Sequence, residues 1–120
     1  MAYESRIYIM RKSEYVPEHA EEIAKIKLAN CDFGLFYDRK DFRDLFKTPI
    51  DFIFTDEFDN DLSVDKYGDE VKYTDIQTVV NFLEKAEAAD PFWRLPPAIA
   101  MLKAFGEYND PNLIVVHYGY

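Results

Sequence analysis

The sequence predicts an α+β fold, in which an about five-stranded, mainly antiparallel sheet packs with three to four helices. Residues 113–118 form an apolar, β-branched run, which is typical of a central strand covered on both faces. Residues 76–86 repeat apolar side chains with helical spacing. Short runs of alternating polar and apolar residues flank a glycine turn at residues 66–69, as in a β-hairpin. The predicted order is β-α-α-β-β-β-α-α-β, in a single domain over residues 1–120.

The N-terminal third is predicted to hold a strand and a helix. Residues 5–11 alternate well enough for a strand. A helix is expected from about Pro17, because proline suits a first helical turn and acids follow it there. Residues 30–34 should end this helix. Its expected apolar face consists of Ala20, Ile23, Ala24 and Leu28.

A shorter helix is expected from about Asp38 to the Thr48-Pro49 pair, because the residue before proline avoids the helical region. Residues 50–73 are then predicted to form a three-stranded antiparallel meander, with residues 50–55 as its first strand. In the hairpin that follows, Leu62 and Val64 should face the core. The apolar stripe of the short helix is Phe42, Leu45 and Phe46.

Two helices are predicted in the C-terminal half. Thr74 and Gln77 have the spacing of a capping box, and Asp90-Pro91 ends the helix that follows. Pro96-Pro97 begins the next helix, and Gly106 ends it. We identify no internal repeat, low-complexity tract or linker. The inward residues should be Ile76, Val79, Val80, Leu83 and Ala86 in the first helix, and Ile99, Leu102 and Phe105 in the second.

Most of the negative charge lies in one stretch. The chain carries a formal net charge of −9, and residues 51–76 contribute −7 of it, with nine acids and two lysines. This distribution argues against a direct nucleic-acid binder and favours a cationic partner. The acids are Asp51, Asp56, Glu57, Asp59, Asp61, Asp65, Asp69, Glu70 and Asp75.

The acidic hairpin is the first candidate binding surface. On the predicted strand, Asp61, Ser63 and Asp65 share one face, with a repeat of ~6.7 Å. Such a row of carboxylates would resemble a phosphate backbone. Alternatively, the acids form a solvated sheet face that maintains solubility and protects an edge strand. The predicted row continues through Asp56, Glu57, Asp59, Asp69 and Glu70.

Trp93 is the second candidate contact residue. It stands beside Arg94 on a connector bounded by prolines, and Trp with Arg is typical of interaction hot spots. The alternative is that a lone Trp fills the core of a small domain.

A calcium loop is a weaker alternative in the acidic segment. Counted from Asp59, acids or hydroxyls occupy positions 1, 3, 5 and 7, and Glu70 occupies position 12. However, Val64 stands where the sharp turn of an EF-hand needs glycine, and Lys66 replaces an apolar residue. We therefore predict no metal site.

No catalytic or cofactor motif is recognisable. The two histidines, His19 and His117, have no nearby serine or cysteine signature of a nucleophilic site. The four glycines are isolated, so a phosphate-binding loop is excluded. Cys31 is the single cysteine, which excludes an internal disulfide, and it is expected to be a small half-buried side chain. We predict no cofactor and a non-enzymatic protein, with a small enzyme that uses His117 as an alternative.

The chain is expected to be cytoplasmic. Its longest purely apolar run, residues 98–102, is far too short to span a membrane. The N-terminus has basic residues but no apolar segment of a signal peptide behind them.

Three segments carry a resemblance to a known group: Ser5-Arg6-Ile7-Tyr8, the Lys66-Tyr67-Gly68-Asp69 turn and the C-terminal Leu-Ile-Val-Val-His-Tyr-Gly-Tyr. The chain resembles small uncharacterised proteins encoded by phages and prophages of Gram-positive bacteria. This resemblance implies a bacterial host cytoplasm and an accessory protein that binds and disables host factors, including defence nucleases. It implies no site residues.

The sequence-based hypothesis is therefore a non-catalytic acidic phage accessory protein that binds a basic surface of a host protein. In its most specific form the partner binds nucleic acid, and the protein is a nucleic-acid mimic that inhibits a defence nuclease, in the manner of an anti-CRISPR. The alternative is a structural or self-assembling interaction domain, a homo-oligomer whose acidity serves only solubility.

Overall fold

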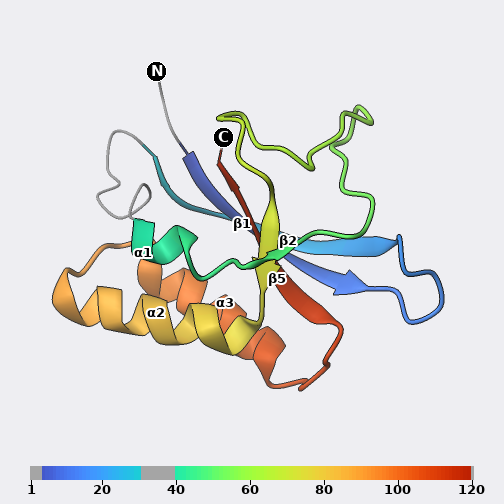
Figure 1. Cartoon of the computed structure of the whole chain (residues 1–120). Helices are drawn as coiled ribbons and strands as arrows, with labels where there is room; N and C mark the ends of the chain where they lie inside the picture. The colour runs from blue at the N-terminus through green and yellow to red at the C-terminus, as the bar shows by residue number, and fades with distance from the viewer. Residues whose placement is uncertain (1–3, 31–39, 120) are drawn as a thin grey trace.

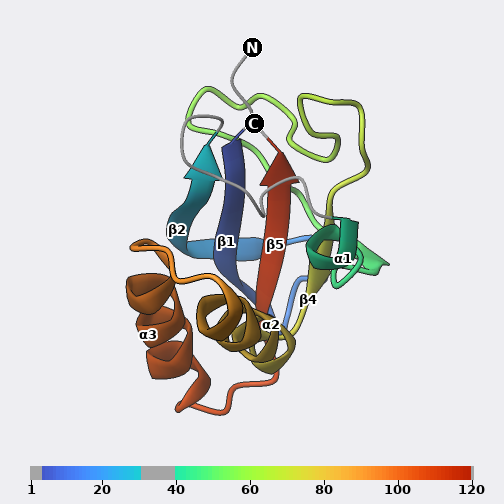
Figure 2. The same cartoon turned by 90° about the vertical axis from the view of Figure 1, so that its left-hand side faces the viewer.

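The computed structural model describes residues 4–30 and 40–119. Five strands form one antiparallel sheet in the order β2-β1-β5-β4-β3, and two long helices pack together on one of its faces (Figures 1 and 2). The predicted α+β class is confirmed, but the order of elements is β-β-α-β-β-α-α-β. The elements are β1 (Glu4–Lys12), β2 (Ala20–Asn30), α1 (Lys40–Arg43), β3 (Thr48–Pro49), β4 (Lys72–Thr74), α2 (Ile76–Ala89), α3 (Leu95–Gly106) and β5 (Leu113–Gly119).

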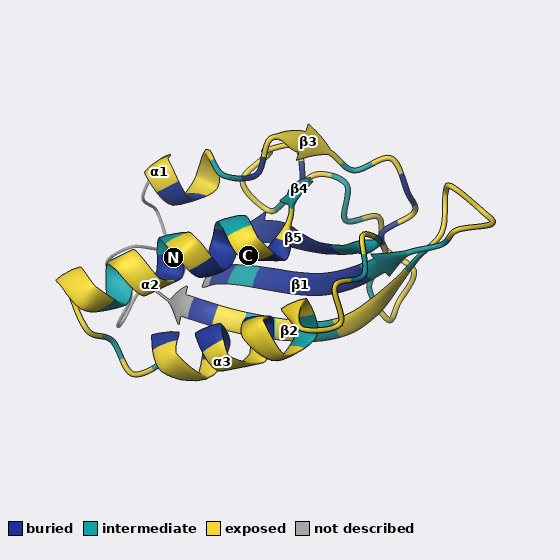
Figure 3. Cartoon of the chain, turned by 90° about the horizontal axis from the view of Figure 1, so that it is seen from below, coloured by how far each residue is buried: buried dark blue, intermediate teal, exposed yellow. Residues whose placement is uncertain are grey.

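The central strands β1 and β5 confirm the two clearest strand predictions. They pair antiparallel, with Ile7 opposite His117 and Ile9 opposite Val115. Both strands are buried along most of their length, and Figure 3 shows them as the dark centre of the molecule. Because successive side chains point to opposite faces, the sheet has a core on each side.

The predicted helix after Pro17 is wrong, because this segment is the edge strand β2. A turn closed by the Ser13 N–H on the His19 carbonyl (3.0 Å) folds the chain back onto β1. The register shifts by one residue at Ile23 and again at Leu28. Because of these bulges, the apolar residues of the strand have a spacing in the sequence that also fits a helix. In the structure the side chains of β2 that pack on the helix-side core are Ala24, Ile26 and Leu28.

The helix-side core joins α1, α2 and α3 to the sheet. Phe42 from α1 is fully buried and contacts the rings of Phe46, Phe82 and His117. The predicted inward faces of α2 and α3 are confirmed, with Ala86 and Phe105 half-buried. The buried residues of the two helices are Ile76, Val79, Val80 and Leu83 in α2, and Leu95, Ala98, Ile99 and Leu102 in α3.

The N-cap of α2 differs from the predicted capping box. Thr74 belongs to β4, and the cap is Asp75, whose Oδ2 accepts from the Thr78 N–H (2.9 Å) and whose Oδ1 accepts from the Thr78 hydroxyl (2.7 Å). Gln77 donates instead to Asn81 on the helix surface (2.8 Å).

We expect Asp75→Ala to lower the free energy of unfolding by about 1 kcal/mol, because it leaves the Thr78 N–H without its side-chain acceptor. Urea unfolding of both variants checks this. Gln77→Ala is the control and should cost less than about 0.5 kcal/mol. An equal loss in the two variants would contradict the assignment of the cap.

Residues 50–71 cover the opposite face of the sheet. Phe52, Phe54 and Val71 are buried in a second core, which contains Tyr8, Met10, Ile114, Val116 and Tyr118 from the sheet. The predicted alternation of residues 50–55 is present in the burial pattern, but the predicted meander is wrong. The Ile53 N–H donates to the Glu18 carbonyl, and the regular strand in this region is β4. Val64, predicted to be inward, is 51% exposed.

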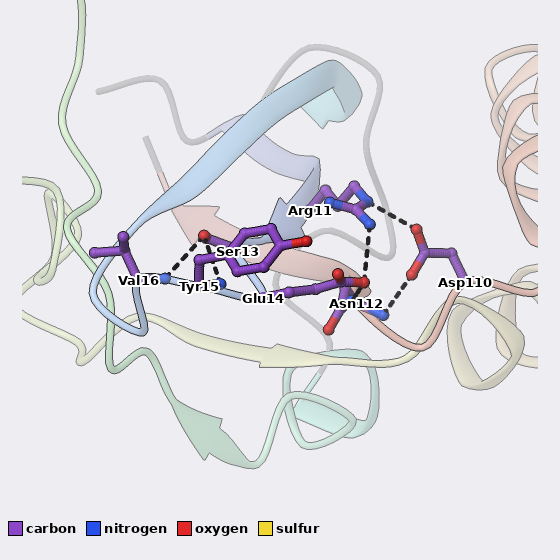
Figure 4. A network of polar contacts seen from close by, with 7 residues as sticks. All are labelled: Arg11, Ser13, Glu14, Tyr15, Val16, Asp110 and Asn112. Carbon is purple, nitrogen blue, oxygen red and sulfur yellow. Dashed lines mark hydrogen bonds and ion pairs between the residues drawn. The ribbon is translucent and has the colours of Figure 1, made fainter.

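A polar network fixes the β1–β2 turn against the start of β5 (Figure 4). Arg11 Nε donates to Asp110 Oδ2 (2.8 Å), and Asn112 Nδ2 donates to Glu14 Oε1 (3.0 Å). The backbone N–H of Asn112 and the Arg11 guanidinium hold the pKa of Asp110 below its usual range. In the turn itself, Ser13 Oγ accepts from two backbone N–H groups, those of Tyr15 and Val16.

Cys31 and Asp38, and with them the predicted end of the first helix and the predicted start of the second, lie outside the described residues. Within residues 4–30 and 40–119, no helix is both long enough and apolar enough to cross a membrane.

Candidate binding surface

The acidic segment folds into two consecutive hairpins. In the first hairpin, residues 54–62, the Asp56 N–H donates to the Asn60 carbonyl (3.1 Å) and the Asp59 N–H donates to the Asp56 carbonyl (3.1 Å). The Leu62 N–H closes the hairpin by donating to the Phe54 carbonyl (2.8 Å).

The second hairpin, residues 63–71, repeats these bonds at the same positions. The Asp65 N–H donates to the Asp69 carbonyl (2.9 Å), the Gly68 N–H to the Asp65 carbonyl (3.1 Å), and the Val71 N–H to the Ser63 carbonyl (2.9 Å). The glycine turn predicted at residues 66–69 is therefore confirmed. The two hairpins form a tandem repeat of nine residues.

The side chain of the first turn residue stabilises each hairpin. Asp56 Oδ1 accepts from the N–H groups two and four residues later, at 2.8 and 3.0 Å, and Asp65 Oδ1 does the same at the same distances. The fourth turn residue has a positive φ in both, 61° at Asp59 and 85° at Gly68, where aspartate and glycine are tolerated. A short polar side chain at one position and a permissive residue three positions later thus encode each turn.

Sequence reading missed this repeat because few of its positions are identical. The shared pattern is Asp, any residue, an aromatic, two turn residues, an acid and an aliphatic residue. It occurs at residues 56–62 and again at residues 65–71. A search of the segment for a period of nine would have found it.

The carboxylates do not form the predicted row. Asp56, Asp61 and Asp65 accept hydrogen bonds from their own turns. The side-chain and backbone N–H groups of Asn60 hold the pKa of Asp56 below its ordinary 3.8. Asp51 pairs with Lys12 at 3.2 Å. The exposed carboxylates that accept none of these turn hydrogen bonds are those of Glu57, Asp59, Asp69 and Glu70.

Each hairpin presents an exposed aromatic side chain at the same position. Phe58 is 76% exposed and Tyr67 is 42% exposed, and both follow the first turn residue by two. Because an Asp side chain binds the backbone N–H of each, these residues have a fixed backbone. Exposed rings on a fixed backbone are suited to contact another molecule at low entropic cost.

The hairpins border two different grooves. The first hairpin supplies Asp56, Glu57 and Asp61 to a groove of about 870 Å³ over β1 and β2. The second supplies Asp65, Asp69 and Glu70 to a groove of about 750 Å³. The basic residues Arg43, Lys47 and Lys72 also line the second groove. With Asp44 counted, the second groove has four acids and three bases among its lining residues, the same balance as the first groove. The two grooves differ in that the aromatic residue of the hairpin, Phe58, lines the first.

Trp93 is not in the core and does not join the acidic residues. It is 66% exposed on the connector between α2 and α3, with the Arg94 guanidinium 4.6 Å from its ring centre. This connector and the hairpins lie apart from each other in both Figure 1 and Figure 2. The two candidate contact sites of the sequence, the acidic hairpin and Trp93, are therefore separate surfaces in the fold.

His117 packs against the helix-side core. Its Nε2 lies 3.0 Å from Ser5 Oγ, and Phe46 and Phe42 pack on its ring at 5.2 and 5.7 Å between centres. Burial, with a smaller contribution from Arg43, lowers its pKa from 6.5 to about 4. Ser5 has no exposed surface, whereas His117 is 9% exposed and lines the second groove.

The described residues contain no group of three or more His, Cys, Asp and Glu side chains that could hold a metal ion. The calcium-loop spacing is divided between the hairpins, with Asp59 and Asp61 in the first and Asp65 and Glu70 in the second. Asp61 bonds to Ser63 through both of its oxygens.

No protein-family model, curated protein sequence or solved structure matches this chain.

Proposed function

We propose that the protein is a non-catalytic binding module, and that the two hairpins contact a basic surface of a partner protein. The observation that carries this proposal is the repeated hairpin, which presents an exposed aromatic ring beside exposed carboxylates twice in succession. Aromatic anchors supply buried area, and the carboxylates supply electrostatic complementarity, which mainly speeds association.

The finer form of the proposal takes the partner to be a nucleic-acid-binding host protein, as the resemblance to phage proteins implies. A regular row of carboxylates would have supported mimicry of a phosphate backbone. The two-hairpin geometry supports contact with a basic protein surface more directly. The experiment therefore also tests whether the protein displaces nucleic acid from the partner.

Glu57→Lys with Glu70→Lys is expected to weaken partner binding at least about tenfold and to reduce its salt dependence. Neither side chain caps a turn, so the hairpins should remain folded. The control is Asp90→Lys with Glu107→Lys, which changes the net charge equally at the C-terminal ends of α2 and α3. Binding is measured at two salt concentrations on a partner first captured from host lysate and purified, with and without nucleic acid as competitor.

Equal losses in the hairpin variant and the control would mean that total charge, and not the hairpins, drives binding. A stable homo-oligomer in light scattering, with no basic partner captured, would instead favour the self-assembling domain.

A further inference from the structure

The groove beside the first hairpin has features that select one kind of side chain. It lies between the hairpin and the strands β1 and β2, with Met10 from β1 and Glu22 from β2 among its lining residues. Its volume of about 870 Å³ is enough for a drug-sized ligand or a few side chains.

An exposed aromatic face and an apolar wall lie together in this groove. Phe58 lines it and is 76% exposed, and Ile53, which also lines it, is 58% exposed. The Phe58 N–H bond to Asp56 Oδ1 fixes the backbone that carries the ring. A ligand therefore meets a ring on a fixed backbone, so less backbone entropy is lost on binding.

Four carboxylates line the same groove, and they outnumber its three basic residues. A guanidinium group is planar, stacks on aromatic faces and donates two parallel hydrogen bonds to a carboxylate. An ammonium group does neither as well, because it is a compact and strongly hydrated charge. The carboxylates are Glu22, Asp56, Glu57 and Asp61, and the basic residues are Arg6, Lys25 and Lys66.

We propose that this groove binds an arginine side chain from an extended segment of the basic partner, with the guanidinium stacked on Phe58 and its methylene groups against Ile53. This inference rests on the proposed function and adds the chemistry of the contact. It distinguishes an arginine-specific site from general attraction between opposite charges.

The test uses two decapeptides, one of alternating arginine and alanine and one of alternating lysine and alanine. Their affinities for the whole protein are measured by isothermal titration at low salt. We expect the arginine peptide to bind about tenfold more tightly, in the range that cation–π and bidentate contacts provide. Phe58→Leu keeps an apolar side chain without the aromatic face, and it should reduce the ratio to about two or less.

Tyr108→Leu is the matched control, because it removes an aromatic ring that is 78% exposed and lies outside both hairpins, and it should leave the ratio unchanged. Equal affinities of the two peptides for the wild type would overturn the arginine site and leave the proposed function standing. If neither peptide binds, both the arginine site and the proposed function are overturned.

Discussion

Replacing Phe54 with alanine is expected to lower the free energy of unfolding by about 3–5 kcal/mol, as is usual for a buried phenylalanine. Phe54 is 3% exposed and packs edge-on against Tyr8, with 5.1 Å between the ring centres. It is also the first residue of the first hairpin, so the substitution removes the side chain that anchors this hairpin to the sheet. Urea unfolding monitored by tyrosine and tryptophan fluorescence measures the loss.

Phe58→Ala supplies the matched comparison, because it removes the same side chain four residues later in the same hairpin. Since Phe58 is largely exposed, its loss should change stability by less than about 0.5 kcal/mol. A large destabilisation by Phe58→Ala would mean that this ring is part of the core, and it would remove the basis for treating it as a contact residue.

Acidification from pH 6.5 to pH 4 is expected to destabilise the protein by about 3 kcal/mol through His117. The folded pKa of about 4 lies below the unfolded value near 6.5, so the unfolded chain binds the proton more readily. The stability from a neutral, buried His117 is complete above pH 6.5 and is lost progressively as the pH falls toward 4. Unfolding free energies measured across this range by urea titration check the slope.

His117→Gln tests the assignment, because glutamine can still bond to Ser5 but does not titrate. The variant should show a much smaller decrease in stability between pH 6.5 and 4 than the wild type. Asp56 and Asp110 have pKa values lowered from 3.8, so their contributions are lost only at more acidic pH. An unchanged slope in His117→Gln would show that another group titrates in this window.

The sequence correctly predicted those elements whose residue pattern fits only one type of secondary structure. The apolar run of β5 fits only a covered strand, and α2 has a helical face bounded by clear end signals. The segment that forms β2 fits both the helical and the strand period, because bulges at Ile23 and Leu28 interrupt its alternation. Its pairing with β1 decides the structure, and that pairing depends on a turn at residues 13–19 that local propensity did not reveal.

The candidate surface was predicted only in part. Composition correctly identified residues 51–76 as the anionic segment, and Gly68 as a turn residue. Composition could not show that Asp56 and Asp65 bind backbone N–H groups, which are defined only once the chain folds. Phe58 was missed because an exposed phenylalanine looks like a core residue in a sequence. Trp93 is exposed, as a contact residue must be, but the sequence gives no distance between its connector and the hairpins.

The most direct test of the two-hairpin surface is an NMR titration of the isotope-labelled protein with the arginine decapeptide. We predict that the amide signals of residues 54–71 shift on binding, with the largest shifts around Phe58, while the indole signal of Trp93 stays in place. Shifts confined to Trp93 and the α2–α3 connector, with unchanged signals in both hairpins, would contradict this account.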